Sequence, residues 1–171
     1  MFDERFISFV DAPGLLRLVG VPIMVDKADL PGVHIAARNL STDFAKVTKG
    51  ASSPLKLVTN EYDGFKQEAE TAIIVGSIEA SSLLQRLEKS GRLDFNKIRG
   101  KWESYMTAIV ENPFERCHKA LVIAGSDKRG AIFGVYALSE QIGVSPYSPF
   151  SQIPHFYLEY KLRLTQVVLV G

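Results

Sequence analysis

The residues most able to do chemistry lie in the segment Gly125–Gly130, Gly-Ser-Asp-Lys-Arg-Gly, which directly follows an apolar stretch. A turn from a strand into a helix presents backbone N–H groups and the positive end of the helix dipole, so it can bind an anion. The glycines have the spacing of a phosphate loop, but Ala131 and Ile132 stand where that motif requires Lys and Ser or Thr. No G-x-G-x-x-G fingerprint is present either. A nucleotide site here therefore lacks its key side chains.

A structural role explains part of the same segment. Asp127, or the serine before it, is a typical cap for a following helix. Gly130 and Gly134 are one helical turn apart and would let that helix approach a sheet closely. The charged heads of Lys128 and Arg129 are expected at the mouth of the turn. We expect Asp127, Lys128 and Arg129 to bind an acidic sugar or dock a neighbouring domain, and a solvated pair of charges is the alternative for Lys128 and Arg129.

Two pairs of adjacent residues resemble functional pairs. Cys117 beside His118 would suit a nucleophile and its base, and Trp102 beside Glu103 would suit a sugar platform with a carboxylate. Neighbours in a helix or strand point apart, however. We interpret Cys117 as a small residue before a strand and Trp102 as a packing residue at a strand entry.

Metal and cofactor chemistry have no support in the sequence. The single cysteine, Cys117, cannot form a disulfide within the chain, and it completes no metal-ligand pattern with the histidines. The histidines are scattered along the chain at His34, His118 and His155. We expect neither a bound metal nor a cofactor.

Composition points to one ordinary globular domain. The chain has 171 residues, of which 46% are hydrophobic and 23% charged. Lysine plus arginine (20) nearly balances aspartate plus glutamate (19), so nucleic acid and anionic membranes are not expected partners. No stretch is long and apolar enough to cross a bilayer, and the start, MFDERFISFV, has no secretion signal. The sequence does not indicate the cellular compartment of the protein.

Periodicity predicts the elements that would position these residues. Short apolar runs predict strands at Pro22–Asp26, Leu55–Thr59, Thr71–Val75, Tyr105–Val110 and Ala120–Ala124, with the last two joined around Asn112-Pro113. Helical spacing predicts helices from Pro31 to Gly50, from Ser77 to Gly91 and from Arg129 to Ile142. Asp29 and Ser77 are the expected caps of the first two helices.

The order β-α-β-β-α-β-β-α predicts an α/β domain with a mixed sheet flanked by about three helices. Strands that follow one another without a helix are expected to pair antiparallel. The aromatic residues at helical spacings, Phe44, Phe133 and Tyr136, are expected in the core rather than in a ligand pocket.

Several segments together resemble a known family. Ala124–Gly130 is followed by Ile132-Phe133-Gly134, Ser139–Gly143 and Val144-Ser145-Pro146-Tyr147. With Pro31-Gly32-Val33, Asp43-Phe44, Ile73–Gly76 and Gly100–Tyr105, these segments resemble the glycoside hydrolase family 115 α-glucuronidases over most of residues 20–147. Members of that family remove glucuronic or 4-O-methylglucuronic acid from xylan.

The resemblance implies an N-terminal α/β domain that precedes a catalytic (β/α)₈ barrel. In such a relative the barrel is the partner of this domain, glucuronoxylan is the substrate, and the carboxylates that act as acid and base belong to the barrel. The resemblance therefore assigns no catalytic residue here, and we expect no activity from the chain alone.

The resemblance ends at Tyr147. We therefore expect residues 1–147 to form the N-terminal domain and residues 148–171, SPFSQIPHFYLEYKLRLTQVVLVG, to form a divergent tail, as truncation before a barrel would produce. Two other functions stay open on the sequence: a stand-alone phosphate or nucleotide binder that uses Gly125–Gly130, and a module that binds another protein.

Overall fold

The computed structural model describes residues 7–8, 15–50, 53–60, 63, 69–144 and 161–162. Its main sheet has five strands in the order β4-β3-β5-β7-β6. The strands are β3 (Ile23–Asp26), β4 (Leu55–Val58), β5 (Ala69–Ser77), β6 (Tyr105–Phe114) and β7 (Cys117–Gly125). The helices are α1 (Pro31–Val47), α3 (Ser82–Lys89) and α4 (Lys128–Gln141). Together these elements confirm the predicted α/β class and element order.

The sheet is mixed, as predicted, but its antiparallel pairing is confined to one edge. β6 pairs antiparallel with β7, whereas β3, β4, β5 and β7 run parallel to one another. The expectation that β4 and β5 pair with each other is wrong. Each of them pairs with β3, which lies between them, so the two strands do not form a hairpin with each other.

The hairpin of β6 and β7 turns later than predicted. Phe114 pairs with Cys117, which places the turn at Glu115 and Arg116. The Asn112-Pro113 pair instead lies within β6, where the register shifts and Asn112 has a φ of 47°. A positive φ at a residue other than glycine is unusual, and asparagine tolerates it better than most residues. The predicted turn is therefore an irregularity in β6.

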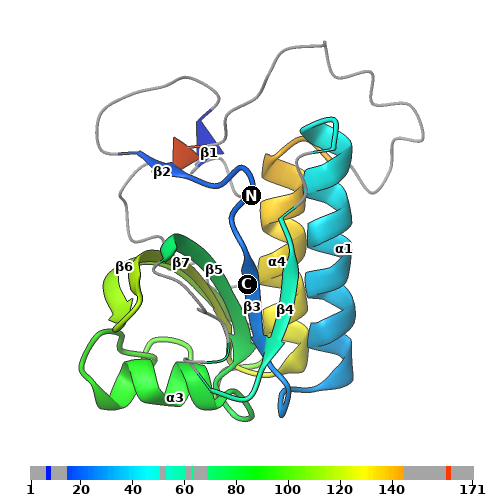
Figure 1. The fold of residues 1–171 in the computed structure, drawn as a ribbon. Coiled ribbons are helices and arrows are strands. Elements are labelled where there is room, and N and C mark those ends of the chain that lie inside the picture. Colours follow the sequence, from blue (N-terminus) through cyan, green and yellow to red (C-terminus); the bar gives the residue numbers. More distant parts are fainter. Residues whose placement is uncertain are drawn as a thin grey trace.

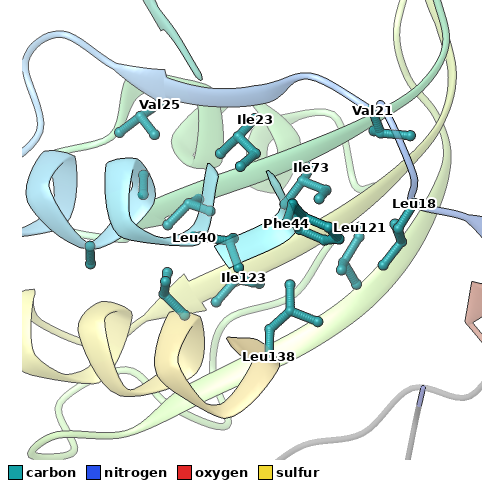
Figure 2. Packing of buried hydrophobic residues seen from close by; sticks show 14 of the residues in the cluster. Leu18, Val21, Ile23, Val25, Leu40, Phe44, Ile73, Leu121, Ile123 and Leu138 are labelled. Carbon is teal, nitrogen blue, oxygen red and sulfur yellow. The ribbon is translucent and has the colours of Figure 1, made fainter. Parts of the chain in front are cut away.

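Two hydrophobic cores cover the two faces of the sheet. Because side chains alternate along a strand, Ile23 and Val25 face α1 and α4 whereas Met24 faces α3. Figure 1 shows α1 and α4 side by side on one face and α3 on the other. Figure 2 shows the first core, in which Leu40 and Phe44 of α1 and Leu138 of α4 meet the strand residues Ile23, Ile73, Leu121 and Ile123.

The helices begin differently from the prediction. Pro31 opens α1 as expected, but the N-cap is Leu30 without a side-chain hydrogen bond, so Asp29 is not its cap. The Oγ of Ser81 accepts a hydrogen bond from the Leu84 N–H and caps α3, a role predicted for Ser77. Ser77 ends β5 instead.

A small second sheet lies beside the first core. It has the order β1-β8-β2, with β1 (Ile7–Ser8), β2 (Leu16–Arg17) and β8 (Lys161–Leu162) paired antiparallel. Ile7 and Leu16 are buried and belong to the core under α1 and α4. β8 falls within the predicted tail, whose other residues, including the VVLV run, lie outside the described residues. The boundary at residue 147 therefore stays a prediction.

Candidate functional site

In the turn between β7 and α4, the anion bound by the backbone N–H groups is the carboxylate of Asp127. The Oδ1 of Asp127 accepts a hydrogen bond from the Gly130 N–H at 2.8 Å, and its Oδ2 accepts one from the Glu103 N–H at 3.0 Å. Asp127 is therefore the N-cap of α4, as predicted. Because its carboxylate occupies the N-terminus of the helix, a phosphate would have to displace it.

The pKa of Asp127 reflects this role. Partial burial raises the pKa, but hydrogen bonds from the backbone N–H groups of Glu103, Gly130 and Arg129, with the charge of Arg129, lower it more. The net pKa lies below the usual range for aspartate. Asp127 is therefore ionised at neutral pH and cannot serve as a general acid there.

Close packing of α4 against the sheet explains the glycines. A Cβ on Gly130 would lie 2.1 Å from the backbone oxygen of Ser104, and one on Gly134 would lie 2.6 Å from Cγ2 of Ile123. Gly125 has the same constraint, because a Cβ there would lie 2.0 Å from the Ala131 nitrogen. The predicted close approach of helix and sheet is confirmed.

The three residues that the sequence grouped as a site have different contacts in the structure. The side-chain Cδ of Lys128 would be 3.2 Å from a Cβ on Gly32, so its stem packs on α1 while the residue remains exposed. The Nη1 of Arg129 lies 2.5 Å from Oε1 of Glu103 in an exposed ion pair. Asp127 caps the helix. Their role toward a sugar or another domain stays a prediction.

The segment before β6 is held in an unusual conformation. Glu103 has a φ of 51°, and its N–H donates to Asp127 while its carboxylate pairs with Arg129. The Ser104 hydroxyl donates to the Trp102 carbonyl at 3.1 Å. Trp102 itself is 86% exposed, so the prediction that it packs at the strand entry is wrong. The positive φ of Glu103 interrupts the regular strand before Trp102 can reach the sheet.

The usual ligand position of an open parallel sheet is filled by protein groups. The helices that follow the neighbouring strands β3 and β5 lie on opposite faces, and such a point commonly opens a crevice. Here the Asp29 carboxylate accepts hydrogen bonds from the N–H and hydroxyl of Ser77, each at 2.8 Å. The Asp26 carboxylate accepts from the N–H of Ser82 at 2.6 Å and from its hydroxyl. These buried carboxylates join β3 to β5 and α3.

A cleft of about 590 Å³ lies along the outer side of α4. One wall comes from α1, another from α4, and the end nearest Arg129 from the segment that enters β6. The lining residues are Asn39, Thr42, Asp43, Lys46, Glu103, Tyr105, Phe133, Tyr136, Ala137, Ser139, Glu140 and Val144. No motif in the sequence indicated this cleft.

Aromatic rings form much of the cleft wall. Phe133 and Tyr136 are 42% and 46% exposed, so the prediction that both belong to the core is wrong. Phe44 is fully buried, as predicted. Smaller residues form the buried face of α4, which packs on the sheet. The two aromatic residues lie on the face of the helix that points away from the sheet.

Ser139 is a buried polar group without a partner. The residue is 5% exposed, and its Oγ is buried and makes no hydrogen bond in the structure. A buried hydroxyl without a partner costs free energy, so such groups are rare. Ser139 lines the cleft, so a rotation of its side chain would bring the buried hydroxyl to a ligand bound there.

The charges in the cleft are largely compensated. Asp43 lies 3.4 Å from the Lys46 ammonium, and Glu103 pairs with Arg129. Among the described residues Glu140 has no ion-pair partner. Burial, and then the negative charge of Glu140, raise the pKa of Tyr105, so its hydroxyl remains a hydrogen-bond donor at neutral pH.

The remaining candidates do not form a reactive centre. Cys117 is buried, and burial raises the pKa of its thiol to about 11, so it is not a thiolate at neutral pH. His118 is exposed. Within the described ranges, no group of three or more His, Cys, Asp or Glu side chains could hold a metal ion. None of the helices described there is long and apolar enough to span a membrane.

Comparison with known proteins gives structural matches only. No protein-family model matches the chain, and no curated protein sequence matches it. BtGH115A, a family GH115 4-O-methyl-α-glucuronidase with specificity for decorated arabinogalactans, matches with a TM-score of 0.59 and 27% identity. CpGH84D matches with a TM-score of 0.49 and 10% identity over 82% of this chain and 20% of its own.

The match to BtGH115A covers 88% of this chain but 17% of that chain. The described fold is therefore similar to one segment of a much longer glycoside hydrolase.

Proposed function

We propose that this chain is a non-catalytic domain of a glycoside hydrolase that removes glucuronic or 4-O-methylglucuronic acid side groups from a polysaccharide. The observation that carries the proposal is the match to BtGH115A, at 27% identity over 88% of this chain. The sequence segments quoted above resemble the same family independently of that structural match.

The chemistry of the described residues supports a non-catalytic role. Inverting glycosidases require an acid and a base carboxyl group about 6.5 to 9.5 Å apart, with the sugar between them. Of the acidic residues in the described lining of the cleft, Asp43 and Glu103 are held in ion pairs and only Glu140 is not. A single uncommitted carboxylate does not provide an acid and a base.

The substrate class follows from the relatives rather than from a site in this chain. The family resembled by the sequence acts on xylan, whereas BtGH115A has specificity for decorated arabinogalactans. Glucuronic acid side groups are common to both descriptions. We therefore propose the acidic side group as the shared feature, with the backbone polymer to be found by experiment.

The alternative of a phosphate or nucleotide binder is not supported by the turn. Its backbone N–H groups donate to Asp127, and the Ser126 N–H donates to the Ser104 carbonyl at 2.8 Å. A phosphate would meet the carboxylate of Asp127 instead of free donors.

The proposal can be tested by measuring sugar release from glucuronoxylan and from decorated arabinogalactan. We expect the purified chain to release no glucuronic or 4-O-methylglucuronic acid above an enzyme-free blank, with BtGH115A as the positive control. We also expect no heat of binding on titration with ATP or inorganic phosphate. Release that is lost in Glu140→Gln would place the active site in the cleft, and saturable ATP binding would support the nucleotide alternative.

A further inference from the structure

We propose that the cleft between α1 and α4 is a binding site for an uncharged sugar residue of a polysaccharide chain. This inference goes beyond the proposed function and does not rest on it, because a sugar-binding domain need not belong to a glucuronidase. It is argued from the apolar wall, the unpaired polar groups and the charge of the cleft.

The apolar wall suits the C–H face of a pyranose. Phe133 and Tyr136 lie one turn apart on α4 and leave large parts of their rings exposed in the cleft. Aromatic residues supply contact area at low entropic cost, and a tyrosine adds a hydroxyl at its edge. Because both rings project from the same helix, they form an apolar surface that is already in place before a ligand binds.

The polar groups beside that wall suit hydroxyl groups. The buried Oγ of Ser139 lacks a partner and can both donate and accept a hydrogen bond. The Tyr105 hydroxyl makes no hydrogen bond to the described residues, and it stays protonated at neutral pH. The exposed side chains of Asn39 and Thr42 line the opposite wall on α1. Sugar hydroxyls, which also donate and accept, match this set of groups.

The charge of the cleft argues against an anionic ligand. Among the described residues that line the cleft, Lys46 is the one cation, and it is already paired with Asp43. Glu140 adds a negative charge with no ion-pair partner in the described part of the chain. A glucuronate or a phosphate would therefore be repelled, while an uncharged sugar would not.

Trp102 is an exposed aromatic residue in the segment that leads to the cleft. It directly precedes Glu103, which lines the cleft, and its indole is 86% exposed. The segment that presents it is fixed by the hydrogen bonds of Glu103 and Ser104.

The experiment is a titration of the ¹⁵N-labelled full chain, followed by its backbone amide shifts in NMR spectra. The probes are galactotriose and xylotriose as neutral sugars, glucuronic acid as an anion, and choline as a cation of similar size. We expect one or both trisaccharides to shift the amides of Phe133, Tyr136 and Ser139 with a dissociation constant of roughly 1 to 10 mM. Glucuronic acid should bind more weakly because Glu140 repels it, and choline is included because a negative charge beside aromatic rings could instead select a cation.

Matched variants separate the cleft from general effects. Ser139→Ala should weaken trisaccharide binding about 3- to 10-fold through one lost hydrogen bond. Ser53→Ala removes another buried hydroxyl without a partner, outside the cleft lining, and should change nothing. Tyr136→Ala should weaken binding about 3- to 10-fold. Ile35→Ala, at an exposed apolar residue of α1 outside the lining, is its control.

Three outcomes would overturn the inference. They are tighter binding of choline or glucuronic acid than of either neutral trisaccharide, shifts confined to residues outside the cleft, and equal affinity in Ser139→Ala, Tyr136→Ala and the wild type. If the chain bound neutral sugars but proved unrelated to any glucuronidase, this inference would hold and the proposed function would be wrong.

Discussion

The carboxylate of Asp127 accepts the hydrogen bonds that a bound phosphate would otherwise receive. The same residue holds Glu103 and the start of α4 through backbone N–H groups. A residue that looks like part of an anion site can therefore serve to stabilise the segment that enters β6. The polar groups left for a ligand lie further along α4, where Ser139 has no partner.

Sequence reasoning identified the folding role of several residues but not the cleft. Asp127, Gly130 and Gly134 were predicted correctly because capping and close packing depend on local chain geometry. Phe133 and Tyr136 were misplaced because aromatic residues at helical spacing usually face a core. Ala131, Val135 and Leu138 already form a continuous buried face of α4. Because α4 has more apolar residues than this face needs, the sequence could have indicated that Phe133 and Tyr136 are exposed.

Gly134→Leu tests the packing of α4 on the sheet. A Cβ at this position would lie 2.6 Å from Ile123 and 3.1 Å from the Tyr105 ring, so a leucine must displace both. We expect a loss of about 1 to 3 kcal/mol in the free energy of unfolding, or failure to fold. Thermal or urea unfolding measures it, with the exposed neighbour change Phe133→Leu as the control. An unchanged midpoint for Gly134→Leu would contradict the close approach.

At the scale of elements, strand and helix positions were largely predictable and strand neighbours were not. A run such as Thr71–Val75 predicts a strand because a short, continuous apolar segment is typical of a strand buried on both faces. Which strand pairs with which depends on contacts far apart in the chain. β3 separates β4 from β5, and nothing in residues 59–68 indicates that insertion. The sequence predicted Asp26 only as the end of a strand and Asp29 only as a helix cap. It did not predict that their buried carboxylates connect β3 to β5 and α3.

The pair Asp26 and Ser82 tests how β3 is coupled to α3. Asp26 is 2% exposed, and its Oδ2 accepts from the Ser82 N–H and hydroxyl at the first turn of α3. Asp26→Ala should lower the free energy of unfolding by about 1 to 3 kcal/mol, because buried donors lose their acceptor. A double-mutant cycle with Ser82→Ala, measured by urea unfolding, should give a coupling of about 0.5 kcal/mol or more.

An exposed acidic residue of the neighbouring turn serves as the control for that cycle. Glu79→Ala should change the free energy of unfolding by less than about 0.5 kcal/mol. Additive effects of Asp26→Ala and Ser82→Ala would show that the hydrogen bonds between the two residues contribute nothing to the stability of the junction.

At the scale of the whole molecule, the described fold is similar to 17% of BtGH115A, and its outer surface has features of a domain that contacts something else. Phe133 and Tyr136 expose large apolar side chains in the cleft, whereas Trp102 and Ile35 are exposed outside its lining. Scattered exposed apolar residues are common, but two aromatic rings that line one cleft indicate a binding surface. The sequence could not predict this surface, since exposure is a property of the assembled layers.

The most direct test of the account is to replace the matching segment of BtGH115A with this chain. We predict that the chimera releases 4-O-methylglucuronic acid from decorated arabinogalactan with a kcat/KM at least about 10-fold above that of a variant lacking the segment, equivalent to about 1.4 kcal/mol. A second chimera carrying Gly134→Leu, which disrupts the fold of the segment, should fall back to the deletion level. A chimera that folds, with a thermal midpoint like that of BtGH115A, but is no more active than the deletion variant would contradict the assignment of this chain as a domain of such a hydrolase.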